Sequence, residues 1–178
     1  KVIGHNLDDK LPNVDISVKA DEEISIFDNT YKIISTPGHT MQHICYFNKD
    51  FSILFAGDTL FSLGCGRMFE GTPELFWKSL KILKRLPKET LVYCGHEYTY
   101  SNLLFALSID PENKDLSEHG KWIKKQCVDA RPTLPTKLQK ELNLNPFLRC
   151  DNEVFKKLYN SDDPIEVFSK MRSAKDNF

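Results

Sequence analysis

Short apolar runs that stop at a glycine-containing turn recur three times in the first half of the chain. They are residues 31–36 before Pro37-Gly38-His39, residues 53–56 before Gly57-Asp58, and residues 91–94 before Gly95-His96. Runs of β-branched and aromatic residues bounded by Gly or Pro are typical of buried strands, and glycine allows the backbone to turn sharply at a strand end. The pattern predicts three strands that share one sheet.

A helical period separates the second of these strands from the third. Apolar side chains recur at i, i+4 and i+7, at Phe76, Leu80 and Leu83. Thr72 is a favourable N-cap, and Pro73 suits the first helical position. These residues predict a helix that packs on the sheet and ends before the proline at position 87.

The pattern becomes helical after Tyr98, and strand signals disappear. One helix is expected after Thr99, with one apolar face made by Tyr100, Leu103, Leu104 and Leu107. A second is expected over Ser117–Asp129, followed by a loop punctuated by Pro132 and Pro135. A last helix starts at the cap Asp163 and buries Ile165, Phe168 and Met171. Strands with one helix, then helices alone, predict an α/β layer over residues 1–98 with a helical domain over residues 99–178.

Composition excludes some partners. The 178 residues carry 24 Lys and Arg against 25 Asp and Glu, so the net charge of −1 provides no general attraction for nucleic acid or an anionic membrane. No apolar run approaches the roughly 20 residues needed to span a bilayer. Five widely spaced cysteines without a C-x-x-C pair indicate free core thiols, which favours the cytoplasm or the mitochondrial matrix. The sequence does not decide the oligomeric state.

The residues that follow the three strands suggest metal chemistry. His39, Asp58 and His96 would meet at one rim of the sheet, and two imidazoles with a carboxylate suit zinc or iron. Each residue also has an ordinary structural interpretation. A turn histidine is commonly a surface or capping residue, and Asp after Gly commonly forms an Asx-turn. Their matching positions favour the metal interpretation.

Three ordered motifs resemble a known family. They are Thr36-Pro37-Gly38-His39-Thr40, Gly57-Asp58-Thr59-Leu60-Phe61 and Cys94-Gly95-His96-Glu97-Tyr98-Thr99, and together they resemble glyoxalase II, the hydroxyacylglutathione hydrolase branch of the metallo-β-lactamase superfamily. The resemblance continues through residues 145–149 and 171–176. It implies an αββα sandwich with a C-terminal helical domain. It also implies hydrolysis of S-D-lactoylglutathione to D-lactate and glutathione, a step of methylglyoxal detoxification.

The resemblance implies a role for each candidate ligand. His39 would bind one divalent metal, His96 a second, and Asp58 would bridge them, with His43 as a hydrogen-bond partner behind the ligands. The metals would be zinc first, with iron or manganese as alternatives. A metal-activated hydroxide would attack the thioester carbonyl, so no Ser or Cys nucleophile is needed, and Cys65 and Cys94 are expected to be structural.

One family motif is missing from the chain. The string THxHxDH, which supplies four further ligands, does not occur, and the chain opens on Lys1. We expect a C-terminal portion of a longer hydrolase, incomplete at its N-terminus, whose activity alone is doubtful. An open sheet face should also make it marginally stable or prone to associate. The alternatives are a catalytically inactive fragment and a sulfur dioxygenase of the same superfamily, but the helical extension argues for the thioester hydrolase.

The resemblance also implies the residues that contact glutathione, an anion that needs local cations and donors. They are Arg67, Phe69, Tyr98, Arg172 and Lys175. Arg67 replaces a Lys of some members and keeps the charge, whereas Phe69 replaces a Tyr and loses a hydroxyl. Arg172 and Lys175 lie three residues apart and share a helix face. Their alternative interpretation is a solvated helix surface.

Overall fold

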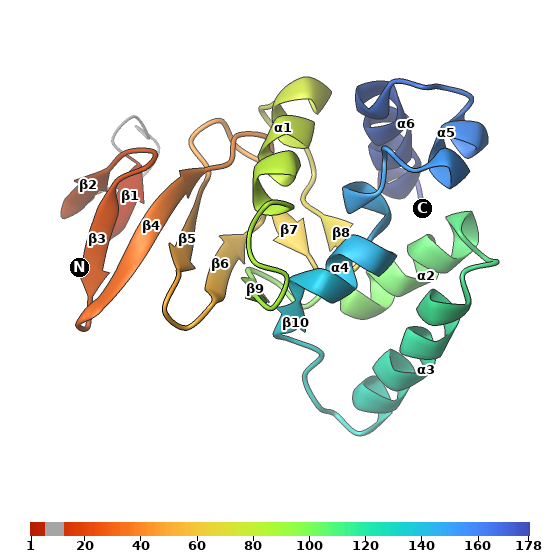
Figure 1. The fold of residues 1–178 in the computed structure, drawn as a ribbon, viewed down its shortest axis with the longest axis horizontal. Helices are drawn as coiled ribbons and strands as arrows, with labels where there is room; N and C mark the ends of the chain where they lie inside the picture. The colour runs from red at the N-terminus through yellow and green to blue at the C-terminus, as the bar shows by residue number, and fades with distance from the viewer. Residues whose placement is uncertain (6–12) are drawn as a thin grey trace.

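A mixed six-stranded sheet forms the centre of the computed structural model, which describes residues 1–5 and 13–178 (Figure 1). The strand order is β10-β9-β6-β5-β4-β3, and all neighbours are antiparallel except β6 and β9. The strands are β3 (Glu23–Ile26), β4 (Asn29–Ser35), β5 (Ile44–Asn48), β6 (Ile53–Gly57), β9 (Leu91–Cys94) and β10 (Thr136–Lys137). Two small pairs accompany them: β1 (Ile3–His5) with β2 (Ile16–Val18), and β7 (Leu60–Phe61) with β8 (Gly64–Cys65).

One helix lies between β8 and β9 in the chain, and the others follow the last long strand and gather at the end of the sheet away from the N-terminus (Figure 1). They are α1 (Pro73–Leu83), α2 (Thr99–Ile109), α3 (Lys114–Val128), α4 (Leu138–Leu144), the 3-10 helix η1 (Pro146–Leu148), α5 (Glu153–Tyr159) and α6 (Pro164–Asp176). The expected α/β layer with a helical extension is therefore confirmed.

Local rules account for the ends of the predicted helices. The Thr72 hydroxyl accepts a hydrogen bond from the Leu75 amide at the start of α1, and the Asp163 carboxylate caps α6 in the same way through the Ile165 amide. The predicted apolar stripe of α1 is fully buried. In α6, Phe168 and Met171 are buried, but Ile165 is only partly covered.

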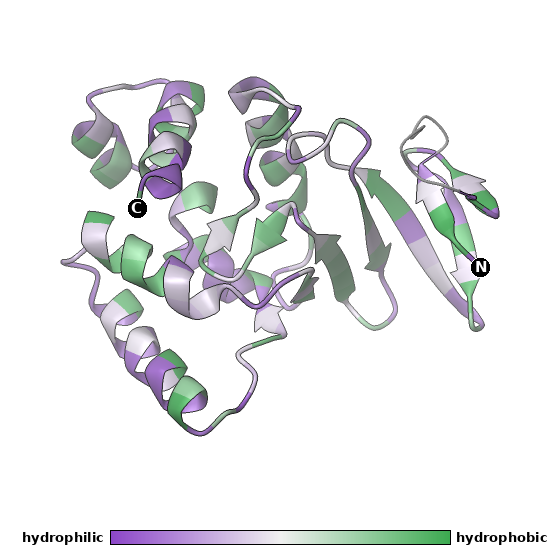
Figure 2. Ribbon diagram, turned by 180° about the vertical axis from the view of Figure 1, so that it is seen from behind, coloured by the Kyte–Doolittle hydropathy of each residue, from purple (hydrophilic) through white to green (hydrophobic). Residues whose placement is uncertain are grey.

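The main core joins the sheet to helices from both halves of the chain. Leu54 and Val92 of the sheet belong to the same buried cluster as Leu80 of α1 and Phe168 of α6. In Figure 2 the middle strands are largely hydrophobic, whereas the C-terminal end of α6 is hydrophilic. A second buried cluster lies between α2, α3, α4 and the β7–β8 hairpin. The helical region is thus packed on the sheet through continuous apolar contacts.

The prediction for the apolar face of α2 is half right, since Leu103 is buried and Leu107 is partly covered, but the other two members of that face are exposed. Leu103, Phe105 and Ala106 are buried, whereas Tyr100 and Leu104 are 44% and 40% exposed. The helix is covered from two sides, by α3 and by the main core, so neighbouring elements rather than its own apolar period choose the buried residues.

Further differences concern short elements. Helix α3 begins at Lys114, earlier than expected, because Asn113 accepts the Leu116 amide and caps it. The prediction that strands end at Tyr98 is also wrong, since the two residues of β10 pair with the edge of β9. A strand of two residues has no recognisable hydrophobic pattern in the sequence. It forms because the unpaired edge of β9 is available for pairing.

All five cysteines are free, as expected. Cys45, Cys65 and Cys150 are buried and Cys94 is partly covered, but Cys127 is exposed, so it is not a core thiol. Within residues 1–5 and 13–178, none of the helices has the length and apolar character required to cross a bilayer.

The sheet face opposite α1 carries a row of aromatic rings. Leu54 and Ala56 of β6 point into the core, so Phe55 between them points to the other face. Its ring centroid lies 6.1 Å from that of Tyr31 and 5.4 Å from that of Tyr93, and Phe55 is 43% exposed. This row is an apolar patch that extends across β4, β6 and β9.

We expect Phe55→Thr to reduce self-association of the chain, because contiguous exposed apolar surface drives proteins together. Sedimentation velocity over a range of concentrations measures this. Phe51→Thr is the matched control, since Phe51 is 63% exposed but stands in the β5–β6 turn, outside the row. Equal association of the two variants would show that the aromatic row is not the contact surface.

Candidate active site

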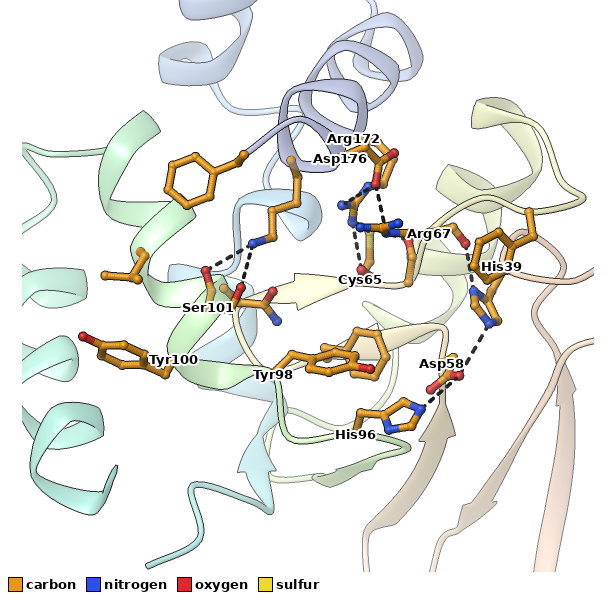
Figure 3. Close-up of a pocket in the computed structure, with 17 residues that line it drawn as sticks. His39, Asp58, Cys65, Arg67, His96, Tyr98, Tyr100, Ser101, Arg172 and Asp176 are labelled. Carbon is orange, nitrogen blue, oxygen red and sulfur yellow. Dashed lines mark hydrogen bonds and ion pairs between the residues drawn. The ribbon is translucent and has the colours of Figure 1, made fainter. Parts of the chain in front are cut away.

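A cavity of about 830 Å³ lies where the ends of β6 and β9 meet α2 and α6 (Figure 3). His39, Asp58 and His96 line one side of it. Arg67, Arg172, Lys175 and Asp176 line another. The three predicted metal ligands and the predicted substrate cations therefore surround one space.

Asp58 lies between the two histidines. Its Oδ2 atom is 3.4 Å from His39 Nε2 and 3.8 Å from His96 Nε2 (Figure 3). Strands β6 and β9 are parallel, so the residues that follow them reach the same edge of the sheet. Gly57 makes the turn into Asp58 with φ +48°, a conformation that favours glycine.

The arrangement of donors and acceptors around Asp58 fits a cation. His39 Nδ1 is 2.8 Å from the Arg67 carbonyl, which can only accept, so Nδ1 carries a hydrogen, and in the neutral ring Nε2 directs its lone pair at the carboxylate. Asp58 Oδ1 is buried and has no hydrogen-bond partner among the described residues. The backbone at Gly95 passes so close that a Cβ there would collide with Oδ1. Facing acceptors and an unpaired buried oxygen are what a metal ion satisfies.

These side chains make only part of a coordination shell. In the described parts of the chain, no group of three or more His, Cys, Asp or Glu is arranged so that it could hold a metal ion by itself. Two imidazole nitrogens share a single carboxylate, whereas a catalytic zinc normally has three protein ligands of its own.

His43 fixes the backbone of Asp58 from behind. The Asp58 amide donates to His43 Nε2 over 3.1 Å, and Nδ1 lies 2.9 Å from the Thr36 hydroxyl and 3.0 Å from the Thr59 hydroxyl. Burial, helped by the nearby His39, lowers the pKa of His43 to about 4. The ring is thus neutral at neutral pH, and Nε2 is free to accept.

The cysteines near the site are not nucleophiles. Burial raises the pKa of Cys65 to about 11 and that of Cys94 to about 12. Both thiols are therefore protonated near pH 7, and the thiolate is the reactive form.

Three cationic residues line the cavity, namely Arg67, Lys175 and the more deeply buried Arg172. Arg67 is mostly exposed, and its Nε atom lies 3.5 Å from Asp176 Oδ1. Lys175 Nζ donates to the Ser101 carbonyl over 3.1 Å and lies above the ring of Phe105. Burial lowers the pKa of Lys175, and the charges of Arg172 and Arg67 lower it further.

Arg172 is buried beside the cavity. Only 4% of the residue is exposed. Its guanidinium donates to the Cys65 carbonyl over 2.9 Å and to Asp176 over 3.1 Å, and it lies above the ring of Phe147. The alternative of a solvated helix face is therefore wrong for this residue. Its hydrogen bonds join β8 to the C-terminal end of α6.

Aromatic rings flank the candidate metal ligands. Phe69 lies against His39 with ring centroids 4.9 Å apart, and Tyr98 stacks on His96 at 5.1 Å. Sequence reasoning missed several lining residues, namely Phe61, Tyr100, Ser101, Asn102, Leu104, Asp176 and Phe178. Of these, Asp176 could have been found, since it stands one helical turn after Arg172. The others reach the cavity only through tertiary packing.

Family models match both halves of the chain. A model described as Hydroxyacylglutathione hydrolase C-terminus matches residues 97–178, and one described as Metallo-beta-lactamase superfamily matches residues 6–96.

Curated relatives match nearly the whole chain. A Hydroxyacylglutathione hydrolase of Hyphomonas neptunium is 44% identical over 171 residues, which is 96% of this chain and 67% of the relative. One of Maricaulis maris is 44% identical over 181 residues, which covers all of this chain and 71% of the relative.

Solved structures share the fold. ETHE1 from Myxococcus xanthus superposes with a TM-score of 0.64 at 23% identity, over 97% of this chain and 57% of that one. A metallo-beta-lactamase from Staphylococcus aureus gives a TM-score of 0.56 at 20% identity, over 94% and 45% of the two chains.

Proposed function

The chain belongs to the hydroxyacylglutathione hydrolase family of the metallo-β-lactamase superfamily, and from this premise we propose that its cavity hydrolyses glutathione thioesters. The observation that carries the proposal is the position of Asp58 Oδ2 between the Nε2 atoms of His39 and His96, in a cavity that also holds Arg67 and Lys175. Metal-ligand residue types and anion-binding residues thus face one another.

The proposed metal ligands are His39, Asp58 and His96, and Asp58 is the proposed catalytic residue. The proposal takes two divalent metals, zinc first, with iron or manganese as alternatives, and each would need ligands in addition to these three residues. When bound, such a metal polarises a carbonyl and lowers the pKa of a water molecule to about 7. The two oxygens of Asp58 could each serve one cation. His43 would keep the Asp58 turn in place through its bond to the Asp58 amide.

The proposed substrate is S-D-lactoylglutathione, released as D-lactate and glutathione. Arg67 and Lys175 would bind its carboxylates, because charge-assisted hydrogen bonds are the strong ones. Phe69 and Tyr98 would flank the reacting end, since they lie against His39 and His96. Arg172 would support this pocket from its buried place behind Cys65.

The division into residues 1–98 and 99–178 remains part of the proposal, and the separate matches to residues 6–96 and 97–178 support it. We also propose a reducing compartment, the cytoplasm or the mitochondrial matrix, because all five cysteines are free. The proposed partner is a small thioester rather than nucleic acid or a membrane, in keeping with the net charge of −1.

The test is an assay of zinc-loaded protein with S-D-lactoylglutathione, following loss of the thioester and release of free thiol, together with metal analysis. Hydrolysis that a chelator abolishes is expected. Oxygen uptake with glutathione persulfide in place of hydrolysis would favour the sulfur dioxygenase, and metal-loaded protein without turnover would favour the inactive fragment. The match of residues 97–178 supports the hydrolase.

We expect Lys175→Met to raise KM about tenfold with little change in kcat, because a hydrogen bond to a charged group contributes roughly 1.5–3 kcal/mol. The lowered pKa of Lys175 adds a pH dependence. Affinity should fall as the pH rises through that pKa, earlier than for an ordinary lysine, and the variant should lack this alkaline decline. Steady-state kinetics from pH 6 to pH 10 measure both effects.

Lys170→Met is the matched control, since Lys170 is on the same helix but bonds the Tyr159 carbonyl and Glu166. An unchanged KM in Lys175→Met would remove Lys175 from the proposed substrate contacts.

A further inference from the structure

The β7–β8 hairpin connects the side of the cavity that carries the candidate metal ligands to the side that carries the candidate substrate cations. Asp58 stands two residues before β7, and Arg67 stands two residues after β8. The hairpin is closed by the turn Ser62-Leu63. Its placement therefore sets the separation between the candidate metal ligand and the candidate substrate cation.

A buried carboxylate from α4 holds this turn. Glu141 is 0% exposed, and each of its oxygens accepts two hydrogen bonds. Oε1 accepts from the Ser62 hydroxyl at 3.2 Å and the Thr136 hydroxyl at 2.7 Å. Oε2 accepts from the Leu63 amide at 2.7 Å and the Asn145 side chain at 3.0 Å. Two of the four donors thus belong to the hairpin turn, about 80 residues away in sequence.

Asn145, one helical turn after Glu141, completes the attachment. Its Nδ2 atom lies 3.1 Å from the Phe61 carbonyl and 3.0 Å from the Gly64 carbonyl, so its two hydrogens are shared between these oxygens and Glu141 Oε2. Its Oδ1 atom accepts the Phe147 amide at the start of η1. One short helix and the cap that follows it therefore hold four polar groups of the hairpin.

The turn needs such support because Leu63 has φ +56°. A branched, non-glycine residue in this conformation is strained and persists only where its surroundings fix it. The Leu63 side chain is fully buried against Leu103 and Leu144, and its amide is the group bound by Glu141.

A movement of the hairpin would displace the candidate metal ligands, because hydrogen bonds connect it to them. The Arg67 carbonyl orients the His39 ring, and the Gly66 amide donates to the Thr59 carbonyl beside Asp58. The Cys65 carbonyl receives the Arg172 guanidinium.

We propose that Glu141 is a positioning residue for thioester hydrolysis: it binds Ser62 and Leu63, fixes the hairpin, and thereby sets the relative places of His39, Asp58 and Arg67. The proposal rests on the proposed function for its catalytic meaning, but the attachment of the hairpin can be measured without turnover.

The test variant is Glu141→Gln, which keeps the size of the side chain but puts an NH₂ donor where one oxygen accepts two bonds. The matched control is Asp110→Asn. Asp110 is also a buried carboxylate, bound to Arg149 at 2.7 Å and to Asn113 at 2.9 Å, at the far end of α2. Both variants should lose stability, but only Glu141→Gln should release the hairpin.

The first measurement is site-resolved alkylation of the native protein, quantified by mass spectrometry. Cys65 in β8 is expected to react about tenfold faster in Glu141→Gln, because local opening exposes it. Cys45 should react at its usual rate, and both thiols should be unchanged in Asp110→Asn. The second measurement is kinetic, and kcat/KM is expected to fall about 10- to 100-fold in Glu141→Gln, in the range typical of residues that orient metal ligands.

Both kcat and KM should change, since His39 and Arg67 are affected together. If Glu141→Gln does not fold, Ser62→Ala removes a single donor, and a smaller rise in Cys65 alkylation is expected. Cys65 alkylation equal to that of Asp110→Asn would overturn the proposal whatever the activity. Absence of hydrolysis in the unsubstituted protein would instead overturn the proposed function, while the alkylation result would still decide whether Glu141 holds the hairpin.

Discussion

Asp58→Asn is expected to lower kcat/KM for S-D-lactoylglutathione by at least about 100-fold, the size of effect seen when one preorganised electrostatic group is lost from an active site. The amide keeps the shape of the side chain but removes the charge between His39 and His96. It also turns one metal-facing oxygen into a donor. Less metal should therefore remain bound, and metal analysis after zinc loading and dialysis measures this beside the kinetics.

Asp129→Asn serves as the control, because Asp129 pairs with Lys125 at the end of α3, outside the residues that line the cavity. Both its metal content and its rate should stay at the level of the unsubstituted protein. Full metal content and near-normal turnover in Asp58→Asn would exclude Asp58 as a ligand and as a catalytic residue.

Arg172→Met is expected to reduce the free energy of unfolding by about 2 kcal/mol, since a hydrogen bond that involves a charged group contributes roughly 1.5–3 kcal/mol. The ion pair itself should add little, because its partner Asp176 is 38% exposed. The variant would leave the Cys65 carbonyl and one side of Asp176 without their donor. Urea unfolding followed by circular dichroism measures the change.

Lys170→Met on the same helix is the control, and its exposed ion pair should contribute well under about 1 kcal/mol. The family resemblance implies instead that Arg172 contacts the substrate, and the residue does line the cavity. A variant with normal stability and a raised KM would support that prediction against the supporting role described above.

Much of the fold follows from local rules. The capping of α1 by Thr72 and of α6 by Asp163, and the three strands before His39, Asp58 and His96, depend on residues close together in sequence. The parallel pairing of β6 and β9 then brings Asp58 and His96 to one edge. Elements that depend on distant partners are different. The buried face of α2 and the strand β10 are decided by what packs against them, and no local period encodes either.

The candidate site divides in the same way. The convergence of His39, Asp58 and His96 could be predicted, because each is a metal-ligand residue type that follows the end of a strand. Charge and helical spacing alone could not show whether Arg172 is exposed to solvent, binds the substrate or is buried and stabilises the fold. Its burial depends on the approach of β8 from the other half of the chain. Glu141 carries no sequence signal, since a lone Glu on a short helix is usually solvated.

His43 has a consequence for acid conditions. An ordinary histidine gains a proton near pH 6.5, but the folded ring resists protonation down to about pH 4. Between these values the unfolded chain binds a proton that the folded chain does not, so the stability that this ring contributes is complete above pH 6.5 and declines as the solution is acidified. Mild acid should accordingly lower the free energy of unfolding through a ring that lies behind the cavity wall, at the turn of Asp58.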